Sequence, residues 1–328
     1  MTLQALVTAL QDGRGFAHKR DISDAMQVLQ RSQPAAHTVL IGDDCAAIPD
    51  GDGYLLFAME GFVDDLVESM PWFSGYCGVM VNVSDIYAMG GRPLAVVDAI
   101  WSAGSSASRA VLEGMAEASS RYGVPVVGGH TNHRSTRSQL AVAIVGRAKQ
   151  LLTSFDARPG QRLLMAIDLR GAYQEPHPYW NASTSAPAER LRADLELLPC
   201  LAEDNLCGAA KDISMAGAIG TALMLLECSG VGANIHLDAI PRPAGVALLR
   251  WLQSFPSFGF VLSVDEENAD AVCQRFHARG IACAAVGSVT AAPQVWLESG
   301  AERAMLWDVA EQPFILAPKA DSEVAQHA

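Results

Sequence analysis

The segment WFSGYCGVMVNVSDIYAMGG, residues 72–91, is the most informative part of the sequence for the fold. Its apolar residues recur at a spacing of three to four, which predicts a helix that ends at the paired glycines. These apolar residues are Val79, Val83, Ile86 and Met89. Asp85 lies in the middle of the helix, where a carboxylate is unfavourable unless it has a partner. Asn82 lies three positions earlier on the same face, so the two residues form a polar notch that favours a functional role.

The segments around this helix mix strands and helices. Residues 1–33 are typical of one or two polar helices. Strands are expected at 37–48, which contains the pair Asp43-Asp44, at 53–61, at 93–102, at 124–129, where the strand enters a Gly-Gly turn, and at 138–148. An amphipathic helix is expected at 108–123.

A second half begins near Leu151. Its expected elements are a strand at 159–169, an irregular stretch at 171–187, helix at 188–205, a glycine-interrupted helix at 212–230 that opens with Asp212, a strand at 232–240, and strand, helix and strand over 258–289. Residues after about 313 are expected to form a loose tail. We therefore expect an α+β protein with two domains, 1–150 and 151–328.

The composition excludes several function classes. The chain has 328 residues, of which 50% are hydrophobic and 18% are charged, so a substantial packed interior is expected. Its formal net charge of -13 argues against nucleic acid as a partner, because phosphates attract basic surfaces. The N-terminus lacks the features of a signal peptide, and no apolar stretch approaches the length that spans a bilayer. The seven cysteines are scattered, which is typical of the reducing cytoplasm.

Polar clusters lie in or at the ends of four expected elements, each beside glycine or other small residues. They are Gly42-Asp43-Asp44, Asn82-Val83-Ser84-Asp85, Gly128-Gly129-His130-Thr131 and Lys211-Asp212-Ile213-Ser214. Converging carboxylates suit a hard cation such as Mg²⁺, which binds a few carboxylates together with phosphate oxygens. Any single aspartate is also explained as a turn or helix-cap residue, so the prediction depends on the clusters meeting.

The adjacent carboxylates Asp43 and Asp44 should repel each other unless something compensates them. Alternation along a strand would point them to opposite faces of the sheet. We therefore expect only one of them to meet a metal ion directly, and the other to hold a backbone amide or an outer-shell water.

These motifs, in this order, resemble those of the aminoimidazole ribonucleotide (AIR) synthetase superfamily, which includes thiamine-monophosphate kinase, selenophosphate synthetase and the hydrogenase maturation dehydratase. The resemblance covers roughly residues 36–290. The motifs that carry it are GDDCAAI, NVSDIYAMGGRP, VVGGHT, KDISMAG and ECSGVGANIHLDAIP. It implies an AIR-synthetase-like α+β fold. The N-terminal mixed α/β domain would bind ATP and pair its strands with those of a second subunit to build a barrel. A C-terminal α+β domain would pack beside it, with ATP and Mg²⁺ in a long cleft.

The resemblance also implies roles for individual residues. Asp43, Asp44, Asp85 and Asp212 would collect the metal ions, with Glu60 as a further ligand. Asp44, Asn82, Asp85, Gly128, Gly129, His130 and Thr131 would line the nucleotide site. Lys19, His130 and Asp212 are the candidate catalytic residues, with Lys19 reaching the phosphates and His130 donating to a phosphate or acting as a general acid. Both Lys19, as a surface lysine, and His130, as a hydrogen-bonded turn histidine, also have ordinary structural explanations.

The sequence departs from the kinase pattern at three positions. Met59-Glu60 replaces Thr-Asp, His130-Thr131 replaces Asp-Thr, and Met215 replaces the second aspartate of the DISDG motif. The motifs are nearer to AIR-synthetase-related proteins of unassigned substrate. Trp180 and Asn181, in the irregular stretch, could bind a flat substrate or anchor the loop.

Two functions follow. The first is an ATP- and Mg²⁺-dependent enzyme, kinase-like or ligase-like, that activates a small molecule by phosphoryl transfer. The second is a non-catalytic nucleotide-binding subunit with an incomplete metal site, which the missing carboxylates favour. A homodimer without a metal is a third reading, but it leaves Asp85 unexplained. The sequence does not identify the substrate.

Overall fold

A computed structural model describes residues 1–29, 39–62 and 64–316 of the chain. The helices are α1 (Leu3–Gln11), α2 (Arg14–Leu29), α3 (Asp64–Ser69), α4 (Pro71–Ala88), α5 (Ser105–Tyr122), α6 (Ala188–Leu195), α7 (Leu197–Glu203), α8 (Gly217–Ser229), α9 (Leu248–Leu252) and α10 (Glu266–Ala278), with a 3₁₀ turn η2 (Leu237–Ala239). The strands are β1 (Ala46–Asp50), β2 (Gly53–Phe62), β3 (Arg92–Ala103), β4 (Val126–Asn132), β5 (Arg134–Ala148), β6 (Arg162–Ile167), β7 (Ala172–Tyr173), β8 (Tyr179–Asn181), β9 (Ala209–Asp212), β10 (Gly232–His236), β11 (Phe255–Pro256), β12 (Gly259–Val264), β13 (Ala282–Thr290), β14 (Gln294–Ser299) and β15 (Glu302–Asp308).

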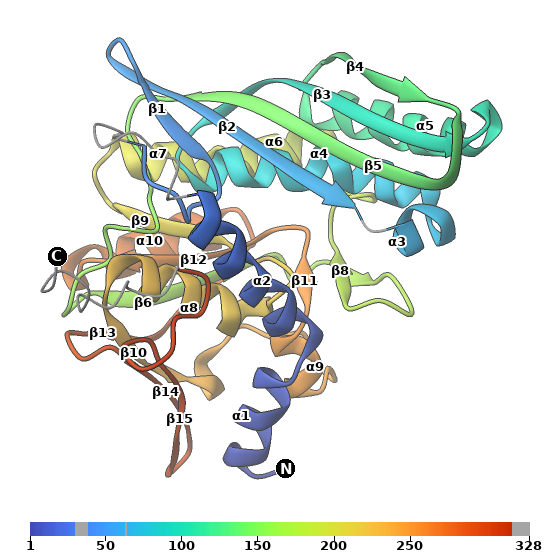
Figure 1. The fold of residues 1–328 in the computed structure, drawn as a ribbon. Coiled ribbons are helices and arrows are strands. Elements are labelled where there is room, and N and C mark those ends of the chain that lie inside the picture. Colours follow the sequence, from blue (N-terminus) through green and yellow to red (C-terminus); the bar gives the residue numbers. More distant parts are fainter. Residues whose placement is uncertain (30–38, 63, 317–328) are drawn as a thin grey trace, which may run out of the picture.

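The first sheet has five strands in the order β1-β2-β5-β3-β4. Strands β2 and β5 pair antiparallel from Tyr54 opposite Ala148 to Phe62 opposite Leu140. Helices α4 and α5 pack side by side beneath this sheet, as Figure 1 shows. Every residue of α4 from Phe73 to Ala88 is buried, because the helix lies between the sheet and the other half of the molecule. The predicted helix and its glycine stop are confirmed.

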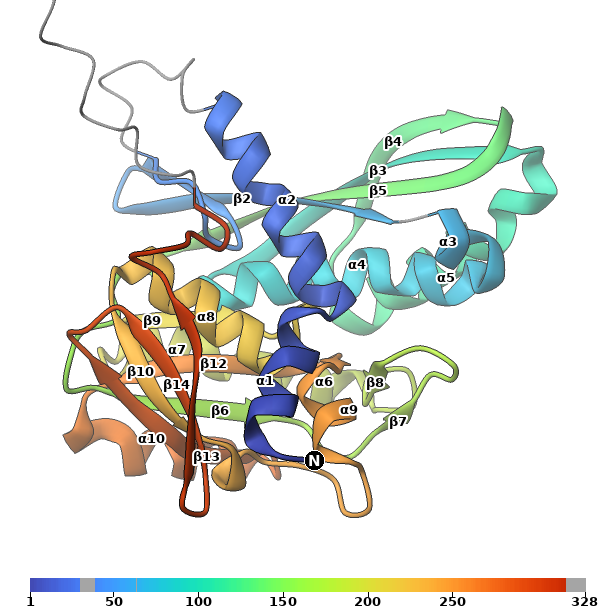
Figure 2. The same ribbon diagram turned by 60° about the horizontal axis from the view of Figure 1, so that its bottom comes forward.

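The second sheet has seven strands in the order β15-β14-β10-β13-β6-β12-β9. The N-terminal helix α1 packs against this sheet: the Leu3 backbone amide donates to Glu302, and the Gln11 side chain donates to the Leu306 carbonyl, both on β15. From there α2 runs along the front of the molecule toward β1 and β2 (Figure 2). The first helices of the chain thus join the C-terminal half to the N-terminal sheet.

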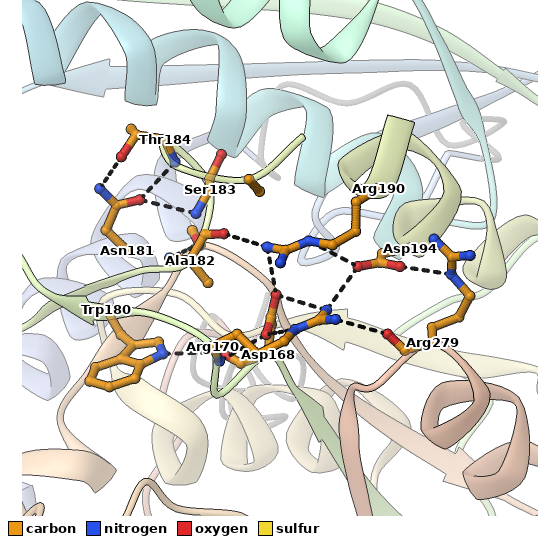
Figure 3. Close-up of polar contacts among 12 residues, drawn as sticks. Asp168, Arg170, Trp180, Asn181, Ala182, Ser183, Thr184, Arg190, Asp194 and Arg279 are labelled. Carbon is orange, nitrogen blue, oxygen red and sulfur yellow. Dashed lines mark hydrogen bonds and ion pairs between the residues drawn. The ribbon is translucent and has the colours of Figure 1, made fainter. Parts of the chain in front are cut away.

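The irregular stretch after β6 is held by a network in which arginines surround two buried carboxylates. Asp168 accepts from Arg170 at 2.7 Å, and Asp194 accepts from Arg170 at 3.0 Å and from Arg279 at 2.8 Å. Arg190 donates to the Ala182 carbonyl at 3.0 Å and also reaches Asp168 (Figure 3). The network fixes the start of α6 and the loop after β8 against the second sheet.

Four expectations about local structure are corrected. Asp43 and Asp44 precede β1 and are not in a strand, since Gly42 has a φ of 124° and interrupts the extended chain. Gly128 and Gly129 are not a turn but lie within β4, where a Cβ on Gly129 would come 2.3 Å from Asp98 Oδ1. Asp212 ends β9, paired with Phe260, and α8 starts only at Gly217.

The fourth correction concerns the expected tail. Phe314 and Ile315 are 0% and 2% exposed, and their backbone amides donate to the buried carboxylate of Glu227 at 2.6 Å and 2.8 Å. The chain is therefore packed up to residue 316, and the rest of the expected tail, 317–328, lies outside the described residues.

Other expectations stay predictions. The five-stranded sheet is open, with β1 and β4 at its edges, and no barrel closes within the described part of this single chain. The structure of a single chain tests neither the expected dimer nor the expected domain boundary at residue 150. Among the described helices, none has the length and apolar character needed to cross a membrane.

The contact between α4 and α5 gives a test of the packing. A Cβ on Gly114 of α5 would come 1.9 Å from the Trp72 carbonyl oxygen, and a Cβ on Gly75 of α4 would come 1.9 Å from the Val111 carbonyl oxygen. Because backbone atoms cannot rotate away, we expect Gly114→Ala to lower the free energy of unfolding by about 2 kcal/mol net, despite the better helix propensity of alanine. Chemical denaturation measures this.

The control is Gly208→Ala, since a Cβ there meets nothing within 4 Å. It should change the unfolding free energy by less than about 0.5 kcal/mol. Equal stability of the two variants would contradict the close helix contact.

Candidate functional site

Three carboxylates from distant parts of the chain meet between the two sheets. Asp44 comes from the segment before β1, Asp85 from α4 and Asp212 from the end of β9. One oxygen of each lies within 4.8 Å of the others. Three of the four polar clusters expected from the sequence therefore converge, as their predicted chemistry requires.

Asp85 is the most constrained member of this acidic cluster. It is 6% exposed, and its Oδ2 atom has no hydrogen-bond partner among the described residues. Burial, together with Asp212 and Glu60, raises the pKa of Asp85 well above its ordinary value. Burial and Asp44 likewise raise the pKa of Asp212 to about 8. Carboxylates in this state are costly to ionise without a cation beside them.

Asp43 and Asp44 have different partners, although they are adjacent. Asp43 accepts from the Ser154 backbone amide at 2.8 Å and from the Ser154 hydroxyl at 2.6 Å. Asp44 faces the cluster and accepts from the Asp212 backbone amide at 3.2 Å. Both aspartates accept from a backbone amide, so this bond does not separate their roles as expected. The reason given, strand alternation, is wrong, because neither aspartate lies in a strand. Which of the two meets a metal ion stays a prediction.

Lys211 belongs to the site, although the sequence predicts no role for it. Its ammonium lies 2.5 Å from Asp44 Oδ1 and 3.9 Å from Asp43 Oδ1. Burial opposes the charged form of Lys211, but Asp44 and Asp43 outweigh burial and keep its pKa above the ordinary value. The sequence signal for this role is that Lys211 directly precedes Asp212 at the end of a buried strand.

A cavity of about 570 Å³ opens beside the cluster. One face of α4 lines it through Phe73, Cys77, Val81 and Asp85, which are spaced one helical turn apart. At a rise of about 1.5 Å per residue, the cavity runs roughly 18 Å along this helix. Its carboxylate end is at Asp85. Its other end, at Phe73, is aromatic: the Phe73 and Tyr179 rings lie 6.3 Å apart, as do the Tyr179 and Phe255 rings.

Two more of the predicted site residues line this cavity. Lys19 lies on α2, and its charge acts on Asp212 and Glu60. Glu60 lies on β2 and is exposed to solvent. Ser214, in the turn between β9 and α8, also lines the cavity, and its Oγ atom has no partner among the described residues.

The remaining predicted residues lie elsewhere. Gly128, Gly129, His130 and Thr131 are exposed on the edge strand β4, and none of these four lines the cavity. Asn82 is fully buried in α4, where its side-chain amide donates to the Gly78 carbonyl at 2.8 Å. Asn82 does not line the cavity either. Of the two residues of the expected polar notch, only Asp85 reaches the cavity wall.

Trp180 and Asn181 line the cavity, but their side chains also form hydrogen bonds with other parts of the chain. The Trp180 indole donates to the Asp168 carbonyl at 3.0 Å, and the Asn181 side-chain oxygen accepts from the backbone amides of Ser183 and Thr184 at 3.1 Å each (Figure 3). These bonds favour the role of loop anchor for both residues.

The cluster has the properties of a site for a hard divalent cation. Its donors are oxygens, which Mg²⁺ prefers. Asp85 Oδ2 and Ser214 Oγ are polar atoms at the cavity that have no partner within the described part of the chain, and buried polar groups normally have one. A cation at the three carboxylates would also offset the burial and the repulsion that raise the pKa values of Asp85 and Asp212.

Comparison with known sequences matches both halves of the chain. Residues 42–148 match the AIR synthase related protein N-terminal domain, and residues 171–298 match the C-terminal domain. The chain is 49% identical over 313 residues to the uncharacterized protein sll0787 of Synechocystis sp., covering 95% of this chain and 97% of that protein. It is 34% identical over 322 residues to the uncharacterized protein MJ0640 of Methanocaldococcus jannaschii, covering 96% of this chain and 99% of that one. The selenide, water dikinase of Trichlorobacter lovleyi is 28% identical over 239 residues, which cover 69% of this chain and 68% of the dikinase.

Solved structures share the fold. T. maritima PurL complexed with ADP superposes with a TM-score of 0.74 at 20% identity, covering 94% of this chain and 53% of that one. AaThiL complexed with AMPPCP and TMP superposes with a TM-score of 0.64 at 18% identity, covering 85% of this chain and 94% of that one. The order of motifs, the two-sheet fold and the matched domains agree, and the chain belongs to the AIR synthase related protein family.

Proposed function

We propose that this protein is an ATP- and Mg²⁺-dependent enzyme that activates a small molecule by phosphoryl transfer. The observation that carries the proposal is the cluster of Asp44, Asp85 and Asp212 at one end of a long cavity. Two similar proteins support it: one is named a selenide, water dikinase, and solved structures of PurL hold ADP or ATP. ATP and one small-molecule substrate are the proposed ligands.

The geometry suggests how the ligands are oriented. Asp44, Asp85 and Asp212 would hold Mg²⁺, which when bound neutralises phosphate charge. Lys19 would reach the phosphates from α2, and Glu60 would lie at the exposed side of the metal site. The aromatic end would take the flat, apolar part of a ligand. In phosphoryl transfer most of the rate comes from such alignment and charge stabilisation, so these residues suffice without a covalent intermediate.

Asp43 has a different proposed part. Its oxygens already accept from Ser154, so we assign it the positioning of Asp44 and not direct metal binding. We propose Asp212 as a metal ligand, and we propose no catalytic role for it apart from metal binding.

The alternative is a nucleotide-binding subunit without activity. Met215 lines the cavity where the kinase motif has a carboxylate, so the metal site has fewer ligands than a kinase of this pattern. The two functions predict the same binding of Mg²⁺-ATP. Production of ADP or AMP in the presence of candidate substrates separates them.

We also propose a homodimer through the outer face of the five-stranded sheet. This face lies opposite α4 and α5 (Figure 1). Phe57 and Val97 are 51% and 41% exposed and alternate in their strands with the buried residues Leu56, Ala58 and Val96, so they belong to this outer face. The register continues the apolar surface across strands, with Phe57 opposite Val145. Contiguous apolar surface of this kind usually marks an interface. A nucleotide role for the exposed Gly128–Thr131 segment would require the cavity of the second subunit, since this segment does not line its own.

The first prediction concerns ligand binding. Mg²⁺-ATP at about 100 times its Kd should stabilise the wild-type protein by about 2.7 kcal/mol, measured as a thermal shift, because only the folded state has the site. Asp85→Asn should lose this shift and any ATP turnover. Asp98→Asn is the control, since Asp98 also has a buried oxygen with no partner among the residues that the structure describes, but it lies on β3 and does not line the cavity. A wild-type protein that shows no shift with Mg²⁺-ATP would overturn the proposal.

The second prediction concerns pH in the absence of metal. A folded pKa of about 8 for Asp212 lies above the unfolded value of about 3.9, so the stability it provides is lost as the pH rises through this range. In EDTA, the melting temperature of Asp212→Asn relative to wild type should therefore rise between about pH 5 and pH 8. Saturating Mg²⁺ should stabilise only the wild type. A difference in melting temperature that does not change with pH would contradict the charge repulsion in the cluster.

The third prediction concerns assembly. The wild-type protein should sediment as a dimer, and Phe57→Glu should sediment as a monomer, because a charge on the apolar outer face cannot be buried without a partner. Met305→Glu, at a residue 44% exposed on β15, should remain a dimer. A wild-type monomer at micromolar concentration would exclude this interface.

A further inference from the structure

The buried lysine of the site divides the acidic residues into two groups, here called halves. One half consists of Asp43 and Asp44, and the other consists of Asp44, Asp85 and Asp212. Lys211 is 6% exposed at its side chain, and its ammonium contacts Asp44 Oδ1 at 2.5 Å and approaches Asp43 Oδ1 at 3.9 Å. It therefore lies on the side of Asp44 that faces Asp43. The other two carboxylates of the cluster, Asp85 and Asp212, lie within 4.8 Å of Asp44 and complete the second half.

The half that contains Asp43 is closed by protein donors. Asp43 Oδ2 accepts from the Ser154 amide, and Oδ1 accepts from the Ser154 hydroxyl at 2.6 Å and from the Asp44 amide at 3.0 Å. Asp44 Oδ1 accepts from Lys211. A cation between Asp43 and Asp44 would have to displace the ammonium and break the bonds from Ser154.

The half that contains Asp85 is open. Asp85 Oδ2 has no partner among the described residues, and both Asp85 and Asp212 line the cavity. Asp44 belongs to both halves: its Oδ1 accepts from Lys211, and its Oδ2 accepts the longer 3.2 Å bond from the Asp212 amide. The acidic residues thus offer one place for a metal ion and one place already filled by a fixed positive charge.

We propose that the Lys211 ammonium occupies the position of a second divalent cation, so that each chain binds a single divalent cation, at Asp44, Asp85 and Asp212. The inference rests on the proposed function, because it assumes that the cluster binds a metal ion. It goes further by assigning Lys211 as a positioning residue and by fixing the number of ions. Five acidic side chains surround this site, and the ammonium is the charge that allows Asp43 and Asp44 to lie side by side without a metal ion.

The test uses Mn²⁺ as the probe, without nucleotide, on the full chain. Calorimetric titration of the wild type should give one Mn²⁺ per chain. Lys211→Met removes the charge with a side chain of similar length, and it should give two Mn²⁺ per chain. In EDTA, Lys211→Met should melt at a lower temperature than the wild type, and Mn²⁺ should raise its melting temperature by more than it raises that of the wild type.

The matched control is Arg170→Met. This change removes a cation that forms ion pairs with the two buried carboxylates Asp168 and Asp194, and none of these three residues lines the cavity (Figure 3). It should also lower the melting temperature in EDTA. Its Mn²⁺ stoichiometry and its Mn²⁺-induced shift should equal those of the wild type, because no metal position is created there.

A second variant keeps the proposal testable if Lys211→Met does not fold. Asp43→Asn should bind one Mn²⁺ with less than about threefold change in affinity, because Asp43 is not a ligand, whereas Asp85→Asn should lose binding. One Mn²⁺ in Lys211→Met, or loss of Mn²⁺ binding in Asp43→Asn, would overturn the role of Lys211. A wild-type chain that binds no Mn²⁺ would instead overturn the proposed metal site.

Discussion

The ion pair between Lys211 and Asp44 joins the two sheets of the molecule at the cavity. Asp44 belongs to the segment that leads into the five-stranded sheet, and Lys211 belongs to β9, the edge strand of the seven-stranded sheet. The same contact brings the backbone amide of Asp212 to Asp44. Two of the three clustered carboxylates are therefore positioned by one buried contact, and the third, Asp85, is brought to them by α4. Breaking a buried pair of this kind leaves an uncompensated charge, which is strongly destabilising.

Helix α4 is buried along almost its whole length, and this burial explains both the fold and the site. Its apolar residues pack between the first sheet and the second half, and Gly75 allows the close approach of α5. The face that carries Phe73, Cys77 and Val81 forms the wall of the cavity and ends at Asp85. A rigid helix therefore sets the distance between an aromatic end and an acidic end. A ligand with phosphates at one end and a flat ring at the other matches this arrangement.

Much of this structure could be predicted from the sequence, and the errors have physical causes. The helix around Asp85 and the strands β2, β3 and β5 follow directly from periodicity and glycine stops. The segment around Asp43 and the glycines of β4 were assigned wrongly, because contacts with Ser154, Lys211 and Asp98 decide their conformation and these residues are distant in sequence. The convergence of Asp44, Asp85 and Asp212 could be expected from their motifs, whereas the role of Lys211 could not, since it depends on two carboxylates more than 160 residues away.

The central claim is that the acidic cluster holds a divalent cation that in turn holds nucleotide phosphates. The most direct measurement is a crystal structure of the protein with Mn²⁺ and a non-hydrolysable ATP analogue, collected to record the anomalous signal of manganese. We expect one anomalous peak per chain, in contact with Asp44, Asp85 and Asp212 and with phosphate oxygens of the analogue. A bound analogue whose manganese lies elsewhere, with these three carboxylates free of metal, would contradict it.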